Sequence, residues 1–91
     1  MNLYDNYEKI YWWDPTGHSQ WMKMEEIDRL EPARCVTVAQ VIREDKNFIV
    51  TAASHSNVEG SETEFADVTI IPKGCVKQRI KMKGAFNAKT K

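Results

Sequence analysis

Apolar residues along this chain occur in short runs that polar turns separate. Five runs of β-branched and aromatic residues predict strands at 7–13, 35–43, 48–53, 67–71 and 75–82. After the first run, four apolar residues recur every third position with acidic residues between them, namely Trp21, Met24, Ile27 and Leu30. This spacing predicts a short amphipathic helix at about 22–30. The order β-α-β-β-β-β predicts a mainly β (α+β) fold, a small SH3-like or OB-like β-barrel of about five strands with one short helix. An open α+β sheet is the alternative.

The first strand carries more aromatic side chains than a small core readily holds. A chain of this size buries only about 60–65% of its unfolded surface. Alternation places Ile10 and Trp12 on one side of the strand and the remaining aromatics on the other. In one alternative both sides of the strand are packed, one of them beneath the helix through Trp21. In the other, one side stays exposed and anchors a protein partner or stacks bases. The candidate partner-binding residues are Tyr7, Tyr11, Trp13 and Trp21.

The last strand alternates apolar and basic residues. Val76, Ile80 and Met82 are predicted to face one way, and four cations the other. Alternate residues of a strand are about 6.6 Å apart, which is comparable to phosphate spacing in a nucleic acid. The candidate nucleic-acid-binding residues are therefore Lys77, Arg79, Lys81 and Lys83. The alternative is an edge strand that lysines protect from aggregation.

Charge separates the chain into two parts although its net charge is zero. Residues 73–91 carry seven basic and no acidic side chains, whereas residues 1–72 carry six basic and thirteen acidic ones. We expect a flexible N-terminal arm at 1–6, a single β-rich domain at 7–83 and a basic disordered tail at 84–91. The polar loop at 54–66 is expected to be mobile, and its acidic residues either are solvated or bind a basic protein.

No sequence motif indicates catalysis, a cofactor or a metal. The chain has no Gly-rich phosphate loop, no H-E-x-x-H and no G-x-S-x-G, so we expect a protein that is not an enzyme. Cys35 and Cys75 are predicted to be reduced, buried thiols, and a zinc site with His18 and His55 lacks paired ligand spacing. No apolar run is long enough to span a membrane and no signal peptide is visible, so a cytoplasmic location without membrane contact is expected.

Three stretches together resemble a group of short uncharacterised proteins of tailed bacteriophages and prophages. They are WWD at 12–14 with Trp21 downstream, LEPARCVTV at 30–38 and IIPKGCV at 70–76. The resemblance covers about residues 10–80 and departs from the pattern at Ala39, where a glycine is expected. It implies a phage-type accessory protein in the bacterial host cytoplasm and assigns no functional residue.

Two functions follow as hypotheses. The first is a non-enzymatic binding module that engages a host or phage protein through the aromatic strand and the acidic loop. The alternative is a nucleic-acid-binding β-barrel that uses the basic strand face and the C-terminal tail. A homo-oligomer formed through an exposed aromatic face is also open.

Overall fold

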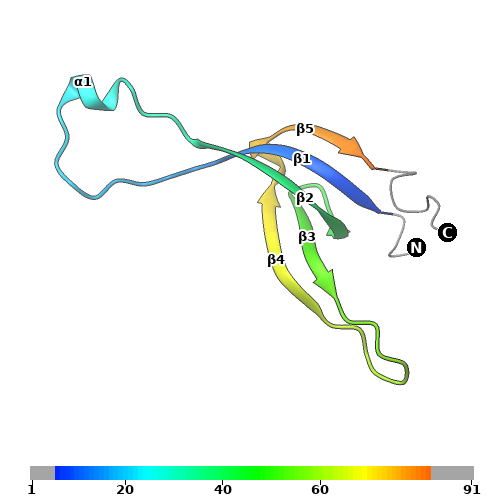
Figure 1. Ribbon diagram of the computed structural model, residues 1–91. Helices are drawn as coiled ribbons and strands as arrows, with labels where there is room; N and C mark the ends of the chain where they lie inside the picture. Colours follow the sequence, from blue (N-terminus) through cyan, green and yellow to red (C-terminus); the bar gives the residue numbers. More distant parts are fainter. Residues whose placement is uncertain (1–5, 83–91) are drawn as a thin grey trace.

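The computed structural model describes residues 6–82 of the chain, and these residues form strands, one short α-helix and one 3₁₀ turn (Figure 1). In chain order the elements are β1 (Tyr7–Asp14), α1 (Met24–Ile27), β2 (Ala33–Glu44), β3 (Phe48–His55), β4 (Phe65–Pro72), the 3₁₀ helix η2 (Lys73–Cys75) and β5 (Val76–Lys81). All five predicted strands are present, and no bound differs from the prediction by more than two residues. The mainly β prediction is confirmed.

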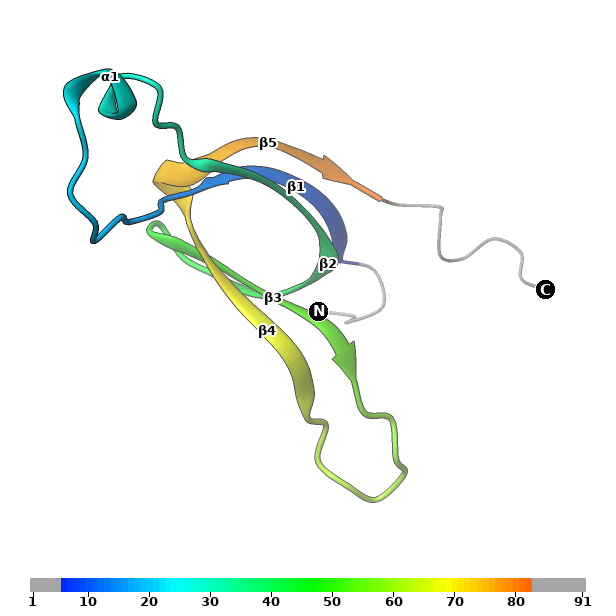
Figure 2. The same cartoon turned by 60° about the vertical axis from the view of Figure 1, so that its left-hand side comes forward.

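The five strands form one antiparallel sheet in the order β4-β3-β2-β1-β5. The sheet curls strongly, so that β1, β2 and β5 arch over β3 and β4 (Figures 1 and 2). It is nevertheless an open sheet, because within residues 6–82 no ladder joins β4 to β5. A closed barrel, which the strand pattern predicted, is therefore not shown.

Two one-residue bulges bend the sheet and change which side chains face its inside. In β2, Val41 lies opposite Thr51 and Arg43 opposite Val50, so Ile42 is the extra residue. In β5, Gln78 lies opposite Tyr11 and Val76 opposite Trp12, so Lys77 is extra. A bulge adds local bend and twist, and each residue beyond it is shifted to the other face.

The core lies on the inner, concave side of the sheet. Ile10, Ile49 and Ile71 are completely buried there and pack with Val41, and Trp12 and Val76 lie against them. The Trp12 indole Nε1 donates a hydrogen bond of 2.9 Å to Thr37 Oγ1. The core is small: among residues 6–82, six hydrophobic residues are buried and twelve large hydrophobic ones are exposed.

The segment between β1 and β2, residues 15–32, is called the β1–β2 loop. The predicted helix at 22–30 is wrong in length, since α1 spans only Met24–Ile27 and none of its residues is buried. Short helices depend on tertiary packing for their stability, and α1 has no sheet surface beneath it. Instead the loop extends away from the sheet (Figure 1). The radius of gyration is 17.3 Å, against about 12 Å for a compact domain of this length.

Two polar turns fix the remaining connections. In the predicted hairpin turn between β2 and β3, Asp45 Oδ1 accepts hydrogen bonds from the backbone N–H groups of Asn47 (2.7 Å) and Phe48 (2.9 Å). In the loop between β3 and β4, Gly60 has φ 84°, a conformation that glycine adopts without strain.

No helix within residues 6–82 has the length and hydrophobicity needed to cross a membrane.

Candidate functional site

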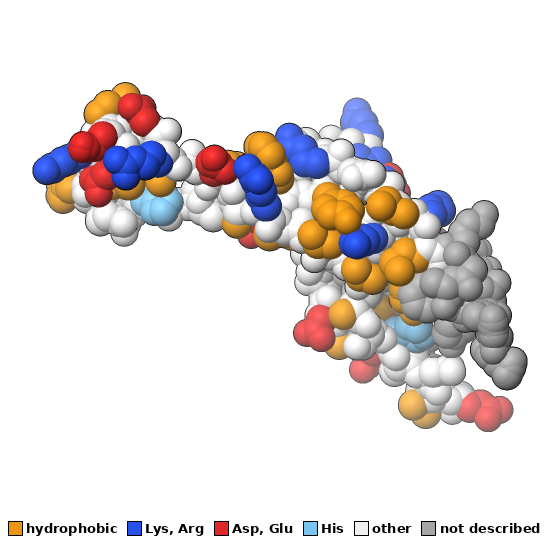
Figure 3. Space-filling view, turned by 45° about the horizontal axis from the view of Figure 1, so that its top comes forward, with side chains coloured by type: hydrophobic (Ala, Val, Ile, Leu, Met, Phe, Trp, Pro, Cys, Tyr) orange, Lys and Arg blue, Asp and Glu red, His pale blue; other side chains and the backbone are white. Residues whose placement is uncertain are grey.

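The convex side of β1, β2 and β5 carries an aromatic and cationic surface, which we call the outer face. Alternate residues of β1 point away from the core, and the register places residues of β2 and β5 beside them. Its members are Tyr7, Lys9, Tyr11, Trp13, Arg34, Val36, Val38, Lys77 and Ile80. Hydrophobic and basic side chains lie next to one another on this side of the molecule (Figure 3).

Basic side chains lie over the aromatic rings of the outer face. Lys77 Nζ is 4.3 Å from the centroid of the Trp13 ring, and Arg34 Cζ is 5.8 Å from it. Lys9 Nζ lies 5.3 Å from the Tyr11 ring. Each exposed contact of this kind contributes about 0.5–1 kcal/mol. The outer face therefore combines a positive potential with exposed apolar surface, since Val36 and Val38 are each more than half exposed.

The sequence predicted the aromatic members of this surface but not all the cations. Tyr7, Tyr11 and Trp13 do share one face, opposite Ile10 and Trp12. Lys9 was missed although the same alternation places it between the two tyrosines. Arg34 was missed because only the register, in which it lies opposite Trp13, brings it to this face.

Trp21 lies apart from the other three aromatic candidates, on the β1–β2 loop. It is 100% exposed, and Met24 is 68% exposed. The alternative in which the aromatic strand packs beneath the helix through Trp21 is wrong. Backbone N–H groups of Arg29 and Leu30 bond to carbonyls three residues earlier, so the turn continues past α1. The loop thus presents a row of exposed apolar residues at intervals of three: Trp21, Met24, Ile27 and Leu30.

The predicted row of four cations on one face of the last strand is corrected. The bulge at Lys77 reverses the alternation, so Lys77 lies on the outer face while Arg79 lies opposite the buried Ile10. Lys81 lies on the same side as Arg79 and donates a hydrogen bond of 3.2 Å to Asn6 Oδ1. Lys83 lies outside the described residues. β5 is an edge strand, which is the position that the edge-protection alternative requires.

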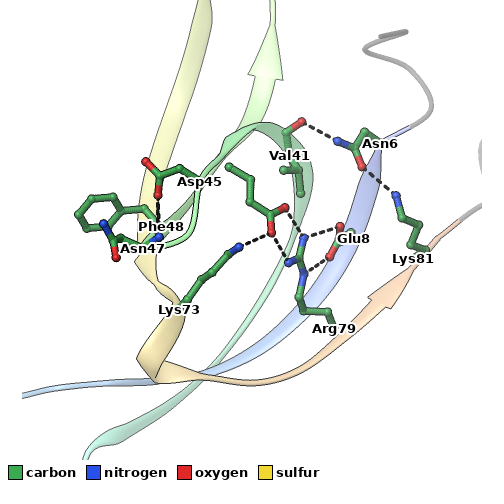
Figure 4. Close-up of polar contacts among 10 residues, drawn as sticks. Asn6, Glu8, Val41, Asp45, Asn47, Phe48, Lys73, Arg79 and Lys81 are labelled. Carbon is green, nitrogen blue, oxygen red and sulfur yellow. Dashed lines mark hydrogen bonds and ion pairs between the residues drawn. The ribbon is translucent and has the colours of Figure 1, made fainter.

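Arg79 is held in a polar cluster on the inner side of the sheet (Figure 4). Its guanidinium donates two hydrogen bonds to Glu8, at 2.7 and 2.8 Å, and two to Glu44, at 2.8 and 2.9 Å. Lys73 Nζ lies 2.7 Å from Glu44 Oε2. The Glu8 side chain is only 4% exposed, so its charge depends on Arg79 for compensation.

Hydrogen bonds in this cluster shift the pKa values of Glu44 and Arg79. Hydrogen bonds from Arg79 and then Lys73 lower the pKa of Glu44 to about 2. Hydrogen bonds to Glu44 and then Glu8 raise the pKa of Arg79 above its ordinary value. These four hydrogen bonds join β5 to β1 and β2, so the cluster is a structural element of the fold.

Asn6, the last residue of the predicted N-terminal arm at 1–6, directly precedes β1 and hydrogen-bonds to β2. Its side-chain Nδ2 donates to the Val41 carbonyl (3.1 Å), and its own carbonyl accepts from the Val41 N–H (2.8 Å). Residues 1–5 and the predicted tail at 84–91 lie outside the described residues.

The cysteine and histidine side chains of the described residues do not form a common site. Cys35 and Cys75 are half-buried, and neither forms a disulfide. Within the described part of the chain, no group of three or more His, Cys, Asp or Glu side chains is placed to hold a metal. His55 Nδ1 lies 3.0 Å from Gln40 Oε1. His18 lines a shallow hollow of about 280 Å³ at the base of the β1–β2 loop, with Pro15, Thr16, Leu30, Glu31 and Pro32.

The predicted acidic loop forms a separate projection between β3 and β4 (Figure 2). Backbone and side-chain groups of Ser56 bond to Glu64, at 2.8 and 2.9 Å, and close its base. Its carboxylates are exposed, and Val58 at its end is 63% exposed.

The chain matches no protein-family model, no curated protein and no solved structure. The resemblance to phage proteins therefore stays a prediction, and the site is interpreted from its own geometry.

Proposed function

We propose that this chain is a small phage-type accessory protein that acts as a non-enzymatic binding module and engages a host or phage protein. The observation that supports this most is the exposure of apolar side chains on two surfaces, the β1–β2 loop and the outer face. Exposed apolar patches rimmed by polar residues are typical of protein interfaces. Trp, Tyr and Arg contribute most often to binding energy in such interfaces, and both surfaces supply them.

The β1–β2 loop is the stronger of the two binding elements. A tryptophan that is 100% exposed contributes nothing to the stability of a monomer, whereas its burial by a partner removes about 150–250 Å² of aromatic surface from water. The loop is also joined to β1 and β2 at paired residues, Asp14 opposite Ala33, which gives it a fixed base.

The finer fold that we propose is a small SH3-like or OB-like barrel, which no ladder closes between β4 and β5 within residues 6–82. The sequential antiparallel order from β1 to β4, and the return of β5 to pair with β1 through η2, support this. The strong curl of β2 at its bulge brings the two halves of the sheet to face one another (Figure 2).

Nucleic-acid binding is the second candidate function. It is favoured by Lys9 and Lys77 beside Tyr11 and Trp13, since stacking rings flanked by cations are typical of single-strand binding sites. It is disfavoured by the engagement of Arg79 with two carboxylates, which leaves fewer cations for phosphates.

Affinity capture with the full chain tests the proposal. The immobilised protein is exposed to lysate of host cells that also produce the untagged chain, with and without nuclease. Trp21→Ala and a control on the other projection, Val58→Ala, are treated in the same way. We expect to capture a protein whose recovery does not change on nuclease treatment. The Val58→Ala control should capture it to the same extent as the wild-type chain. Trp21→Ala should weaken its binding at least about tenfold, as loss of a buried aromatic anchor does.

Two results would contradict the proposal. Capture that Trp21→Ala leaves unchanged would remove the loop from the interface. Recovery that disappears on nuclease treatment would favour the nucleic-acid alternative instead.

A further inference from the structure

We propose that the partner which the outer face accepts is a second copy of this chain, and that the β1–β2 loop of that copy docks on it. This inference rests on the proposed function, because it names the protein that binds these two surfaces.

In a single copy, the apolar side chains of both surfaces are exposed to solvent. Trp21 and Met24 on the loop and Val36 and Val38 on the outer face are all exposed at the same time. The loop extends away from the sheet and does not cover the outer face of its own chain (Figure 1). Docking of a loop on the outer face of another copy would bury both surfaces in one contact.

Charge makes the two surfaces complementary. Residues 15–32 contain four acidic and two basic side chains, whereas the cations of the outer face are Lys9, Arg34 and Lys77. Arg34 already pairs with Glu31 of its own chain at 3.1 Å, so the charges available to a second copy are the other ones. On the loop, Glu25 and Asp28 are exposed and have no ion-pair partner within residues 6–82. On the outer face, Lys9 and Lys77 contact aromatic rings and are likewise without a carboxylate partner in this part of the chain.

The order of apolar and charged residues on the loop also matches their order on the outer face. On the loop, Met24, Ile27 and Leu30 follow one another at intervals of three, and Glu25 and Asp28 follow at the same interval beside them. On the outer face, the register places Lys9 between Val38 and Ile80. An acidic row beside an apolar row on the loop therefore meets a cation between two apolar residues on the sheet.

A second copy explains the surplus of exposed apolar side chains better than a one-sided partner. Twice as many large hydrophobic residues are exposed as hydrophobic residues are buried in residues 6–82. When two copies exchange loops, each contact is made twice, which brings a small contact toward the standard interface area of about 1,600 Å².

Sedimentation velocity with charge-reversed variants tests this. The loop variant carries Glu25→Lys and Asp28→Lys, and the face variant carries Lys9→Glu and Lys77→Glu. The control, Glu59→Lys with Glu62→Lys, makes the same charge change on the β3–β4 loop. All are compared with the wild-type full chain over a wide concentration range, with circular dichroism to verify folding.

The expected result is that the wild-type chain and the control self-associate to the same extent. Each charge-reversed variant alone should associate at least about tenfold more weakly, because like charges then oppose one another. An equal mixture of the two should regain the complex, since the reversed loop meets the reversed face.

A wild-type chain that stays monomeric, or an oligomer that neither variant weakens, would overturn the inference. If a monomeric chain still captures another protein through Trp21, this inference fails while the proposed function stands; if it captures none, both fail. A complex that forms only on addition of a single-stranded oligonucleotide, and that the face variant abolishes, would assign the outer face to nucleic acid instead.

Discussion

Arg79 holds the edge strand β5 to its neighbour β1 and to the next strand, β2. It bridges Glu8 of β1 and Glu44 of β2 from its place on β5, and Lys73 reaches Glu44 from η2. A charge-assisted, two-pronged contact of this kind is stronger than a neutral hydrogen bond. Its importance follows from burial, because the nearly inaccessible Glu8 has no route to water.

Replacement of Arg79 should destabilise the fold. Arg79→Met leaves the buried Glu8 charge uncompensated, which costs about 3–5 kcal/mol of unfolding free energy. Lys81→Met, on the same strand and side, removes only an exposed contact and should cost less than about 1 kcal/mol. Urea unfolding of both variants measures the difference. Equal losses for the two would show that the cluster does not stabilise the sheet.

Acid should weaken the same cluster through Glu44. Its folded-state pKa of about 2 lies below the ordinary value of 4.5, so the ionised carboxylate stabilises the fold above that value. This contribution is lost as the pH falls from about 4.5 toward 2. Urea midpoints of the wild-type chain should fall through this range.

Glu44→Gln supplies the control for the acid prediction. The variant should start less stable at neutral pH and lose less stability on acidification than the wild-type chain. The lowered pKa of Asp45 in the adjoining turn remains in both proteins and gives the residual slope. Parallel pH profiles for the two chains would refute the assignment to Glu44.

The β1–β2 loop is the element that departs most from its sequence prediction. The spacing of three predicts an amphipathic helix at about 22–30, yet in the structure the same residues form an exposed row. Periodicity shows that apolar residues share a side, but it does not show what covers that side. The strands were predictable because alternation and turn residues such as Asp45 act locally.

Removal of the β1–β2 loop should leave the sheet intact. The β1–β2 pairing ends with Asp14 opposite Ala33, so an Asn-Gly turn can replace residues 15–32. We expect an unchanged β-sheet circular dichroism spectrum and an equal or higher thermal midpoint, since a shorter loop costs less entropy to close. Capture of the protein partner should be lost.

Unfolding of the loop-deleted chain would contradict this view of the loop as a binding element. Trp21→Ala provides the comparison, because it should lose binding while the full loop is kept. Its stability should stay within about 0.5 kcal/mol of the wild-type value, as for other exposed substitutions.

The whole molecule has a small core and an extended shape, and the described residues expose more large hydrophobic side chains than they bury. The sequence predicted the class, the strand order along the chain and the shared face of Tyr7, Tyr11 and Trp13. It did not predict the inward position of Arg79, because one extra residue at Lys77 reverses the alternation and leaves no mark in the pattern. The same holds for Glu44, beyond the bulge at Ile42.

Site-specific photocrosslinking shows directly whether the β1–β2 loop contacts a protein partner. A photoreactive phenylalanine analogue replaces Trp21 in one chain and Val58, the matched exposed position on the β3–β4 loop, in another. Each is expressed in the bacterial host and irradiated, and its adducts are identified by mass spectrometry. We predict a protein adduct from position 21 that position 58 does not give, with twice the chain mass if the partner is a second copy. Equal adducts from both positions, or none from position 21, would contradict the role of the β1–β2 loop as a protein-binding element.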